Sequence, residues 1–589
     1  MEKLKKNKVW QGIPASPGVA IGKAYLLDRE EIKIKEEKLP PGQIQKEILR
    51  FKKALHEAKK EIVKLKENIA KKLGTEQAKI FDAHLLILED EVVNQQVFNG
   101  IKEEKKNAEF IYSRIIQKTI QAISSTKYEY LKERVADISA VSTRVINRLL
   151  GLKQHTIEPL RTPGIIVAHS LSPGDVVQMK KESVLGFATD TGGKTSHVAL
   201  LAKSLGFPAV VGLKGFFSKV RSGGKLILDG DKGEVILSPD DVTLKSYELK
   251  REKLLERSRS LLELTALLAE TQDKRRIELS ANIELPSDVE SAVENGAEGI
   301  GLFRTEYLYL ASSDLPSEEE QYQIYSSIAQ RVYPQNVIIR TFDMGGDKFI
   351  HDPERPYEPN PFLGWRAIRA CLDLPQVFKI QLRAILKASS LGNLNLMLPM
   401  ISSLEELLKT KEVLEEVKVE LRAKKVPFDE KLKIGIMIEI PSAALEADSL
   451  AKHCDFFSIG TNDLIQYTLA VDRTNERIAH LYQSFHPSVL KLIKKTIDEG
   501  HKNNIWVGLC GEMAADPKAI VLLVGLGINE LSTSPLAIPQ VKKVIRSIEF
   551  KEAQKFAEEV MRLNDSKKIE KLLEEDYYRR FGSENFSKI

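Results

Sequence analysis

The sequence has few cysteines and little excess charge of either sign, and both shortages exclude classes of protein. Its 589 residues include only 3 cysteines (Cys371, Cys454 and Cys510) and no CxxC pair, so we expect neither a disulfide framework nor a cysteine zinc site. Lys and Arg total 88 against 83 for Asp and Glu, a net charge of +5. So small a surplus does not predict a nucleic-acid-binding face.

Long apolar runs and a targeting segment are also missing. The longest apolar runs, such as residues 519–526, fall well short of the ~18 residues that span a bilayer. The N-terminus, MEKLKKNKVWQGIP, lacks the apolar stretch of a signal peptide. We therefore expect a cytoplasmic protein that neither enters a membrane nor binds nucleic acid. Its length predicts about four domains at ~150 residues each.

Two separated segments share a pattern of short strands and turns. Residues 9–27 (VWQGIPASPGVAIGKAYLL) and residues from about 159 to 238 alternate short apolar runs with Gly and Pro, which is typical of strands. The intervening Lys/Glu-rich stretch instead carries apolar residues at alternating spacings of 4 and 3 from Ile44 to Ile69, which predicts a long helix ending near Gly74. We interpret the strands as one small α/β domain interrupted by a helical bundle.

The rest of the chain alternates apolar strands with amphipathic helices. After a Lys/Glu/Leu-rich stretch at 241–273, which we interpret as a linker helix, eight strands are expected. They are residues 277–283, 299–303, 337–341, 394–399, 434–439, 456–459, 506–509 and 530–533. Eight such strands over roughly 300 residues predict a (β/α)8 TIM barrel, so the chain as a whole is a multidomain α/β protein. An open doubly wound sheet is the alternative, but no Gly-rich dinucleotide turn follows the first strand.

Polar residues gather where the expected strands end, which is where the active site of such a barrel lies. These residues are Arg304, Arg340, Asp343, Glu439, Asn462, Asp463, Arg473, Cys510 and Glu512. Arginines that converge on one mouth match the geometry of a phosphate or carboxylate ligand. Each arginine could instead pair with a carboxylate of the barrel, but their occurrence at consecutive strand ends favours an anionic substrate.

Glu439 closes an otherwise apolar strand, where a carboxylate is costly to bury without a partner. A structural salt bridge would satisfy it. Mg²⁺, which is held by one or two carboxylates plus substrate phosphate, would also do so with Asp463 as the second ligand, and we favour this interpretation. Cys510, beside Gly511 and Glu512, is by residue type an inert buried thiol. Its position at the predicted mouth also makes it a candidate proton donor or acceptor.

A second cluster lies in the small α/β domain, in TGGKTSHVALLAKSLGFPAVVG (191–212). Two glycines allow an unusual turn, Thr195 can cap, and a helix is expected from Ser196 to Leu205, ended by Gly206. His197 falls in its first turn, where free N–H groups favour an anion over an imidazolium. His197 is thus a candidate neutral nucleophile. A capping or surface histidine is the alternative, which spacing alone slightly favours.

These motifs resemble those of a known family. The segment at 192–212 is similar to the phosphohistidine signature of the phosphoenolpyruvate-utilising enzymes. The barrel motifs of that superfamily resemble FRTEYLYL (303–310), RTFDMGGDK (340–348), NPFLGWRAIR (360–369), IGIMIEIPSA (434–443), FFSIGTNDLIQYTLAVDR (456–473) and GLCGEMAAD (508–516). With the amino-terminal QGIPASPGVAIGKA, and in one order from about residue 8 to about 570, they resemble the Enzyme I family of the bacterial sugar phosphotransferase system.

The resemblance implies a phosphoenolpyruvate–protein phosphotransferase. The phosphoryl group of phosphoenolpyruvate, bound with Mg²⁺ in the barrel, would pass to His197 and then to the phosphocarrier HPr, while Cys510 protonates the enolate to pyruvate. By the same resemblance, Arg304, Arg340, Asn462, Asp463 and Arg473 bind phosphoenolpyruvate, and Glu439 and Asp463 hold Mg²⁺. It also implies domains: a phosphohistidine domain in two parts (1–30 and 151–240), an inserted HPr-binding domain (31–150), a linker helix (241–273), and a barrel (274–589) through which two copies form a homodimer.

Other functions share part of this pattern. Pyruvate phosphate dikinase and phosphoenolpyruvate synthase carry both signatures but add a nucleotide-binding domain. Only about 190 residues precede His197, and we find no GxxxxGK[ST] turn. A nitrogen-regulatory paralogue would add an N-terminal sensory domain, which is not expected here. An inactive docking scaffold is disfavoured because His197, Glu439, Asp463 and Cys510 are all present.

Overall fold

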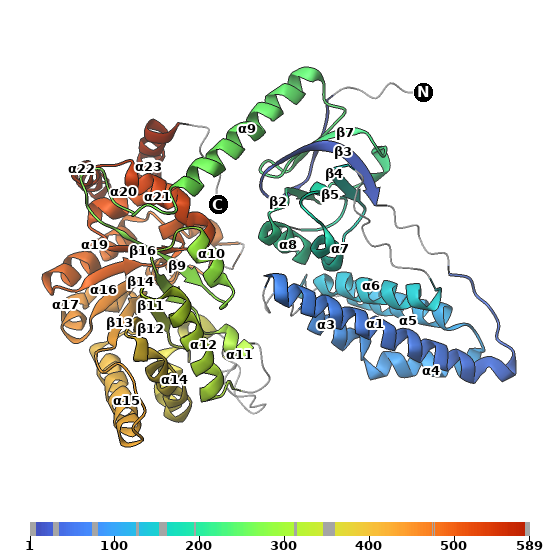
Figure 1. The fold of residues 1–589 in the computed structure, drawn as a ribbon, viewed down its shortest axis with the longest axis horizontal. Coiled ribbons are helices and arrows are strands. Elements are labelled where there is room, and N and C mark those ends of the chain that lie inside the picture. The colour runs from blue at the N-terminus through green and yellow to red at the C-terminus, as the bar shows by residue number, and fades with distance from the viewer. Residues whose placement is uncertain are drawn as a thin grey trace. The chain divides into compact units, whose positions relative to one another are not determined.

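The computed structural model describes residues 7–27, 34–73, 80–124, 129–151, 162–193, 196–310, 315–345, 358, 360–473, 475 and 477–582. The chain divides into two compact units, residues 1–257 and 258–589. Figure 1 labels most elements of both units. Among the described residues, no helix is long and apolar enough to cross a membrane.

The first unit contains a mixed eight-stranded sheet in the order β1-β8-β7-β3-β4-β5-β6-β2. Its strands are β1 (Lys8–Gln11), β2 (Ile13–Ser16), β3 (Val19–Leu27), β4 (Gly164–Ala168), β5 (Val184–Thr189), β6 (Ala209–Val211), β7 (Lys225–Asp229) and β8 (Glu234–Leu237). Strand β3 pairs in parallel with β4, although more than a hundred residues separate them in the sequence. The strands before and after the helical region therefore form one sheet, which also carries α7 (Pro173–Gln178) and α8 (His197–Leu205).

A helical bundle fills the sequence between β3 and β4. Its helices are α1 (Ile44–Leu73), α3 (Ile80–Leu88), α4 (Glu91–Glu104), α5 (Ala108–Ser124) and α6 (Glu129–Leu149). Along α1, Ile48, Phe51 and Ile62 of the expected apolar seam are buried, as the 4-3 spacing predicts. They belong to the same hydrophobic cluster as Phe187 of the sheet, so bundle and sheet share a core.

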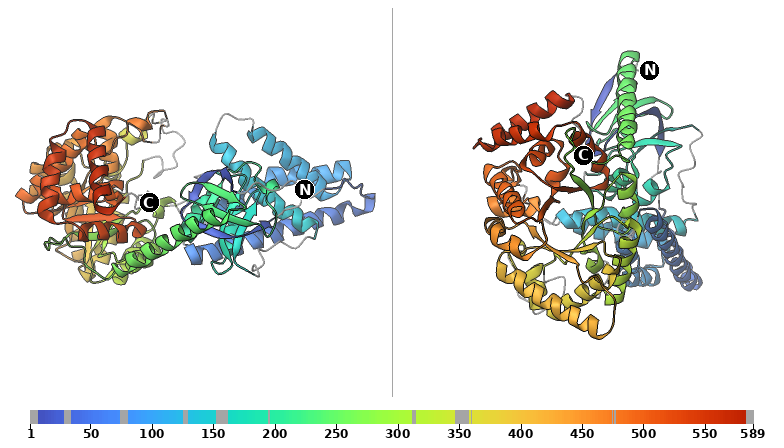
Figure 2. Two further views of the ribbon diagram at one scale, coloured as in Figure 1. Left: turned by 90° about the horizontal axis from the view of Figure 1, so that it is seen from above. Right: turned by 60° about the vertical axis from the view of Figure 1, so that its left-hand side comes forward.

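The second unit is a closed barrel of eight parallel strands, surrounded by helices (Figure 2). The strands are β9 (Glu278–Ile283), β10 (Ile300–Phe303), β11 (Val337–Arg340), β12 (Leu394–Leu398), β13 (Lys433–Ile438), β14 (Phe456–Ile459), β15 (Trp506–Leu509) and β16 (Glu530–Thr533). Each begins and ends within one residue of the predicted bound. The TIM-barrel prediction is therefore confirmed.

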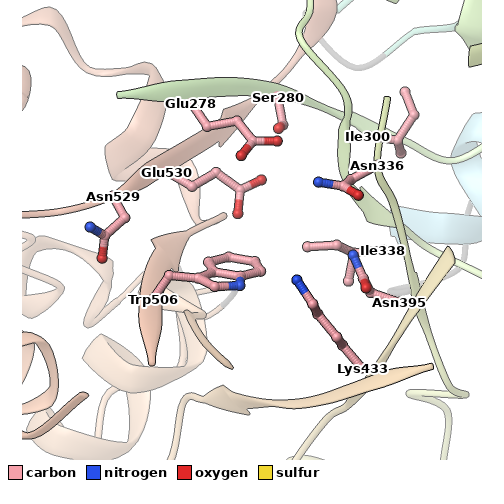
Figure 3. A pocket seen from close by; sticks show the side chains of 10 residues that line it. All are labelled: Glu278, Ser280, Ile300, Asn336, Ile338, Asn395, Lys433, Trp506, Asn529 and Glu530. Carbon is pink, nitrogen blue, oxygen red and sulfur yellow. The ribbon is translucent and has the colours of Figure 1, made fainter. Parts of the chain in front are cut away.

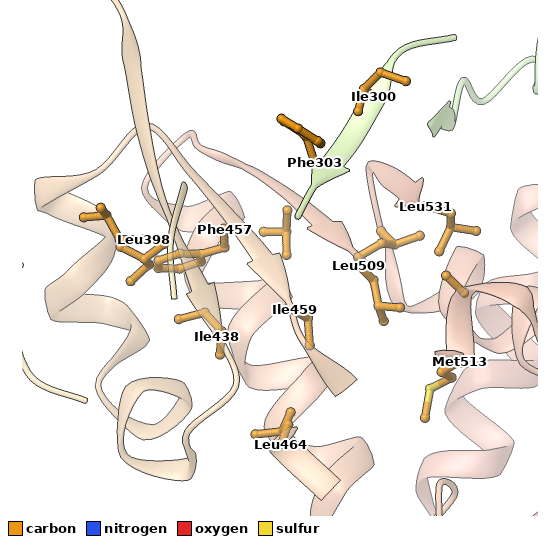
Figure 4. Packing of buried hydrophobic residues seen from close by; sticks show 14 of the residues in the cluster. Ile300, Phe303, Leu398, Ile438, Phe457, Ile459, Leu464, Leu509, Met513 and Leu531 are labelled. Atoms are coloured by element: carbon orange, nitrogen blue, oxygen red, sulfur yellow. The ribbon is translucent and has the colours of Figure 1, made fainter. Parts of the chain in front are cut away.

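Helices follow the strands around the barrel. They are α10 (Asp288–Glu294), α11 (Tyr307–Leu310), α12 (Glu318–Val332), α13 (Ile368–Asp373), α14 (Pro375–Ala388), α15 (Leu404–Ala423), α16 (Pro441–Leu445), α17 (Ala447–Leu450), α18 (Thr461–Leu469), α19 (Pro487–Lys502), α20 (Pro517–Leu526), α21 (Ile538–Arg546), α22 (Phe550–Met561) and α23 (Ser566–Phe581). The main core lies between strands and helices, where Ile438, Phe457 and Leu509 are fully buried (Figure 4). A smaller cluster that includes Met397, Met437 and Cys510 fills the barrel interior.

The expected linker helix at 241–273 is shorter than predicted. Helix α9 runs only from Asp241 to Glu263. The following residues bind the barrel instead: the N–H of Ala269 donates to Glu298 Oε1 at 2.9 Å, and Lys542 Nζ donates to the Thr265 carbonyl at 3.0 Å. These tertiary hydrogen bonds replace helical ones, which the composition of the stretch does not reveal.

Candidate active site

Three carboxylates meet at the C-terminal end of the barrel. Asp343 follows β11, Glu439 follows β13, and Asp463 lies in the first turn of α18, after β14. Each offers an oxygen atom, and these atoms all lie within 4.8 Å of one another. The structure thus brings together Glu439 and Asp463, as the sequence predicted, and adds Asp343 as a third carboxylate.

Glu439 is the most deeply buried of the three, with 2% of its surface exposed. Its Oε1 accepts a hydrogen bond from the N–H of Met400 at 2.7 Å. A Cβ atom at Gly460 would lie 2.9 Å from its Oε2, so glycine leaves the space that this carboxylate occupies. Burial raises the pKa of Glu439 well above its ordinary value, and the nearby charges of Asp463 and Asp343 raise it further. A positive charge placed here would be strongly favoured.

Asp463 has a raised pKa for the same main reason. Burial raises it, and the charge of Asp343 adds to this effect, although Arg366 acts in the opposite direction. Asp343 differs, because the cations Arg340 and Arg366 outweigh its burial and lower its pKa. The site therefore contains one carboxylate neutralised by arginines and two that lack full compensation.

Two guanidinium groups border the carboxylates, that of Arg340 buried and that of Arg366 half-buried. Arg340 contacts Glu306 through Nη2 at 2.9 Å and Asp343 through Nη1 at 3.1 Å, while its buried Nε has no hydrogen-bond partner among the described residues. Arg366 donates from Nη2 to Asp343 Oδ1 at 2.6 Å and lies 3.5 Å from Asp463 Oδ2. Despite the desolvation that opposes it, the pKa of Arg340 is raised by Glu306, Asp343 and Glu439. Both arginines remain cations.

The remaining predicted residues lie at the rim. Arg304 Nη1 contacts Glu284 at 2.5 Å, and Arg473 Nη1 contacts Glu512 at 3.0 Å. Asn462 Nδ2 donates to the same Glu512 at 3.2 Å. The predicted arginines are thus each paired with a carboxylate of the barrel. The two rim pairs are partly or largely exposed, and such pairs contribute little to stability, so a bound anion would displace them at low cost.

Cys510 follows β15 and belongs to the cluster that fills the barrel interior, with 3% of its surface exposed. Burial raises the pKa of its thiol to about 11, although a hydrogen bond with Ser458 and the charge of Arg340 partly oppose this. The thiol is therefore protonated at neutral pH. It can act as a proton donor, and the thiolate is not its resting form.

His197 belongs to the first unit. It is the first residue of α8, and Ser196 is the N-cap, whose hydroxyl accepts from the N–H of Ala199 at 3.3 Å. The helix ends at Gly206, which has a φ of 67°. These bounds match the predicted helix. The predicted cap Thr195 lies outside the described residues, and Ser196 has that role in the structure.

The residues that follow the expected strands include most of this site, but they do not include Arg366 and Glu306. Arg366 lies in the segment NPFLGWRAIR between β11 and β12, and it does not directly follow a strand. Glu306 lies between β10 and α11 and binds both Arg340 and the N–H of Asp343. The family motifs contain both residues, and those motifs were the only signal in the sequence that could have indicated them.

Comparison with known families gives matches along the chain. The model "PEP-utilising enzyme, N-terminal" matches residues 11–134, "PEP-utilising enzyme, mobile domain" matches 160–233, and "PEP-utilising enzyme, PEP-binding domain" matches 258–550. A solved structure titled "NMR solution structure of Enzyme I (nEIt) protein" is 42% identical over 42% of this chain and 99% of its own, with a TM-score of 0.36.

Curated relatives match over nearly the whole sequence. Phosphoenolpyruvate-protein phosphotransferase of Staphylococcus carnosus is 42% identical, covering 96% of this chain and 98% of the relative. The proteins of that name from Haemophilus influenzae and Bacillus subtilis are 42% and 41% identical, with coverage of 96% of this chain and 98% and 99% of the relatives. At this identity and coverage, the chain belongs to the phosphoenolpyruvate-protein phosphotransferase family.

Proposed function

We propose that this chain takes the phosphoryl group of phosphoenolpyruvate onto His197 and passes it to a histidine of the phosphocarrier protein HPr. The observation that best supports this activity is the barrel mouth, where three close carboxylates lie beside the guanidinium groups of Arg340 and Arg366. This combination suits a phosphate ester bound together with a divalent cation. An uncharged substrate would not require these carboxylates and guanidinium groups.

We propose that Mg²⁺ is held by Glu439 and Asp463, with Asp343 close enough to contribute. The donor set fits, because hard carboxylate oxygens are the ligands that Mg²⁺ prefers. Burial and the neighbouring carboxylates raise the pKa of both Glu439 and Asp463, so a cation would relieve an existing electrostatic cost. When bound, the ion would neutralise negative charge on the phosphoryl oxygens.

Arg304, Arg340, Asn462 and Arg473 then bind phosphoenolpyruvate. Guanidinium forks bind carboxylate and phosphate oxygens in a bidentate manner, and the Nε of Arg340, which has no partner in the described part of the chain, is a further donor. Arg366, paired with Asp343 and close to Asp463, orients two carboxylates of the site. We add it to the residues predicted from the sequence.

Phosphoryl transfer breaks the bond between phosphorus and the enol oxygen and forms one to an imidazole nitrogen of His197. The helix N-terminus favours the negative charge of the phosphoryl group that His197 then carries. The remaining enolate needs a proton at its methylene carbon to become pyruvate. Cys510, protonated at neutral pH because burial raises its pKa to about 11, donates that proton and later regains one from solvent.

We further propose that HPr docks on the helical bundle of the first unit, that the barrel forms a homodimer, and that the protein is cytoplasmic. These assignments rest on membership of the family. Sedimentation of the full chain at several concentrations would test the dimer, since a monomer at all concentrations would contradict it.

Labelling with radioactive phosphoenolpyruvate and Mg²⁺ tests the central proposal. We expect an acid-labile label on the peptide that contains His197, no label in His197→Ala, and no dependence on ATP. The variant should still bind phosphoenolpyruvate, because the binding residues belong to the other unit. Labelling that requires ATP would indicate a dikinase-like enzyme, and no labelling at all would indicate a docking scaffold.

A further inference from the structure

The barrel has a second polar site at its other end, where the strands begin. A cavity of about 210 Å³ lies there, and its wall includes Glu278, Glu530, Asn395, Lys433 and Trp506 (Figure 3). None of these residues takes part in the proposed reaction. Since barrel interiors are usually filled by layers of branched apolar side chains, this polar layer requires another explanation.

One wall of the cavity is acidic. Glu530 of β16 and Glu278 of β9 are direct partners in the register of these adjacent strands, and their carboxylates face each other (Figure 3). Like charges at such positions are destabilising. Nevertheless the barrel makes room for Glu530, since a Cβ at Gly301 would lie 2.4 Å from its Oε1 and one at Gly508 would lie 2.7 Å from its Oε2.

The opposite wall carries a cation and an amide. Asn395 of β12 and Lys433 of β13 are also register partners, and these strands lie across the barrel from β16 and β9. Asn395 is 6% exposed, and its side chain, which points into the cavity (Figure 3), forms no hydrogen bond within the described part of the chain. Its amide is open to the cavity, since none of its atoms is among the fully buried polar atoms without a partner, and it can therefore bind a ligand there. Within the same described residues, the exposed Lys433 forms no ion pair, although its charge partly opposes the rise in the pKa of Glu278 that burial causes.

We propose that this cavity binds a small zwitterion, an amino acid with few carbon atoms. Its ammonium group lies against Glu278 and Glu530, and its carboxylate accepts from Lys433 and Asn395. Trp506, stacked on Phe456 with ring centroids 4.4 Å apart, offers a flat apolar surface for the carbon chain between these groups. The volume of the cavity, smaller than the sites of drug-sized ligands, limits the ligand to a few heavy atoms.

The charges of the lining agree with a zwitterion. Burial raises the pKa of both Glu278 and Glu530, that of Glu530 to about 8, so the two carboxyl groups are not both ionised at neutral pH. Lys433 places one positive charge on the opposite wall. A simple cation would be repelled by Lys433, and a simple anion would be repelled by the carboxylates.

Titration calorimetry of the full-length protein with five small probes tests this proposal. The probes are glycine, β-alanine, γ-aminobutyrate, propionate and propylamine. We expect at least one of the three amino acids to bind, with propionate and propylamine at least tenfold weaker. Propionate lacks the ammonium group, and propylamine lacks the carboxylate. Hydrogen bonds to charged groups are worth about one to two decades in affinity.

Two variants locate the binding. Lys433→Met and Asn395→Leu should each weaken it about tenfold or more, whereas Lys431→Met, which removes an exposed lysine two residues away, should leave it unchanged. Turnover of phosphoenolpyruvate should match the parent in all three variants, which also shows that they fold. The proposal is overturned if no amino acid binds at millimolar concentration, if propylamine binds as tightly as the amino acids, or if Lys433→Met binds like the parent.

Discussion

Burial changes the protonation of individual side chains in the barrel. The thiol of Cys510 and the carboxyl of Glu530 both lie inside the barrel, where loss of solvent raises the pKa of each. At one end of the barrel this keeps a thiol protonated beside the proposed substrate. At the other end it keeps an acid partly protonated next to a second carboxylate. Both effects can be measured by replacing a single residue.

Replacement of Cys510 separates proton donation from binding. In Cys510→Ala we expect pyruvate formation to fall ~10²–10⁴-fold, the usual contribution of a general acid, with phosphoenolpyruvate affinity nearly unchanged. Because the thiol pKa is about 11, the Cys510-dependent step should not change through neutral pH and should decline only as the pH approaches that value. Stopped-flow measurement of pyruvate release tests both expectations, and an unchanged rate would reduce Cys510 to a packing residue.

Replacement of Glu530 tests the acidic wall through stability. The carboxyl of Glu530 has a pKa of about 4.3 in the unfolded chain and of about 8 in the folded protein. The folded state therefore binds this proton more tightly. The resulting stabilisation is complete below the unfolded pKa and is lost as the pH rises to about 8. Between pH 5 and 9, the free energy of unfolding of Glu530→Gln should therefore fall less steeply than that of the parent. The exposed control Glu319→Gln should keep the parent slope.

At the scale of secondary structure, helix α8 begins at His197. Ser196 caps this helix through its hydroxyl, and loss of such a cap typically costs ~1 kcal/mol. Ser196→Ala should lower the stability of the first unit by about that amount and slow phosphoryl transfer to the carrier, whereas Ser196→Asp, which also caps, should retain stability. Chemical denaturation followed by circular dichroism tests this. Equal stabilities of the Ala and Asp variants would contradict the role of the cap.

The strands and their ends were predictable because each barrel strand is a short apolar run between turns. All eight strands appear within one residue of the predicted bounds, and Glu439 and Asp463 are close together as the fold requires. Arg366 was not predictable in this way, since its loop position carries no periodicity. The end of α9 was missed because tertiary hydrogen bonds from Ala269 and Lys542 determine it. The polar cavity lined by Glu278 and Lys433 was also missed. Its side chains come together only when strands far apart in the sequence, such as β9 and β16, pair in the barrel.

At the scale of the whole molecule, the proposed nucleophile and the proposed substrate site belong to different units. His197 lies in residues 1–257, and every residue assigned to phosphoenolpyruvate or Mg²⁺ lies in residues 258–589. If the proposed function is right, the two half-reactions are separable: His197 meets the barrel site in one and a carrier in the other. Cutting the chain near the boundary should separate them.

A fragment of residues 1–257 should fold, because it contains all strands of its sheet and the bundle that shares a core with them. We expect it to exchange phosphoryl groups reversibly with phosphorylated HPr and to remain unlabelled by phosphoenolpyruvate. The complementary fragment, residues 258–589, contains the closed barrel and should bind phosphoenolpyruvate and Mg²⁺ without acquiring a stable phosphohistidine. His197→Ala in the first fragment is the matched control and should abolish exchange. If the first fragment became labelled from phosphoenolpyruvate alone, its own residues would have to bind the substrate, and the division of labour between the units would be wrong.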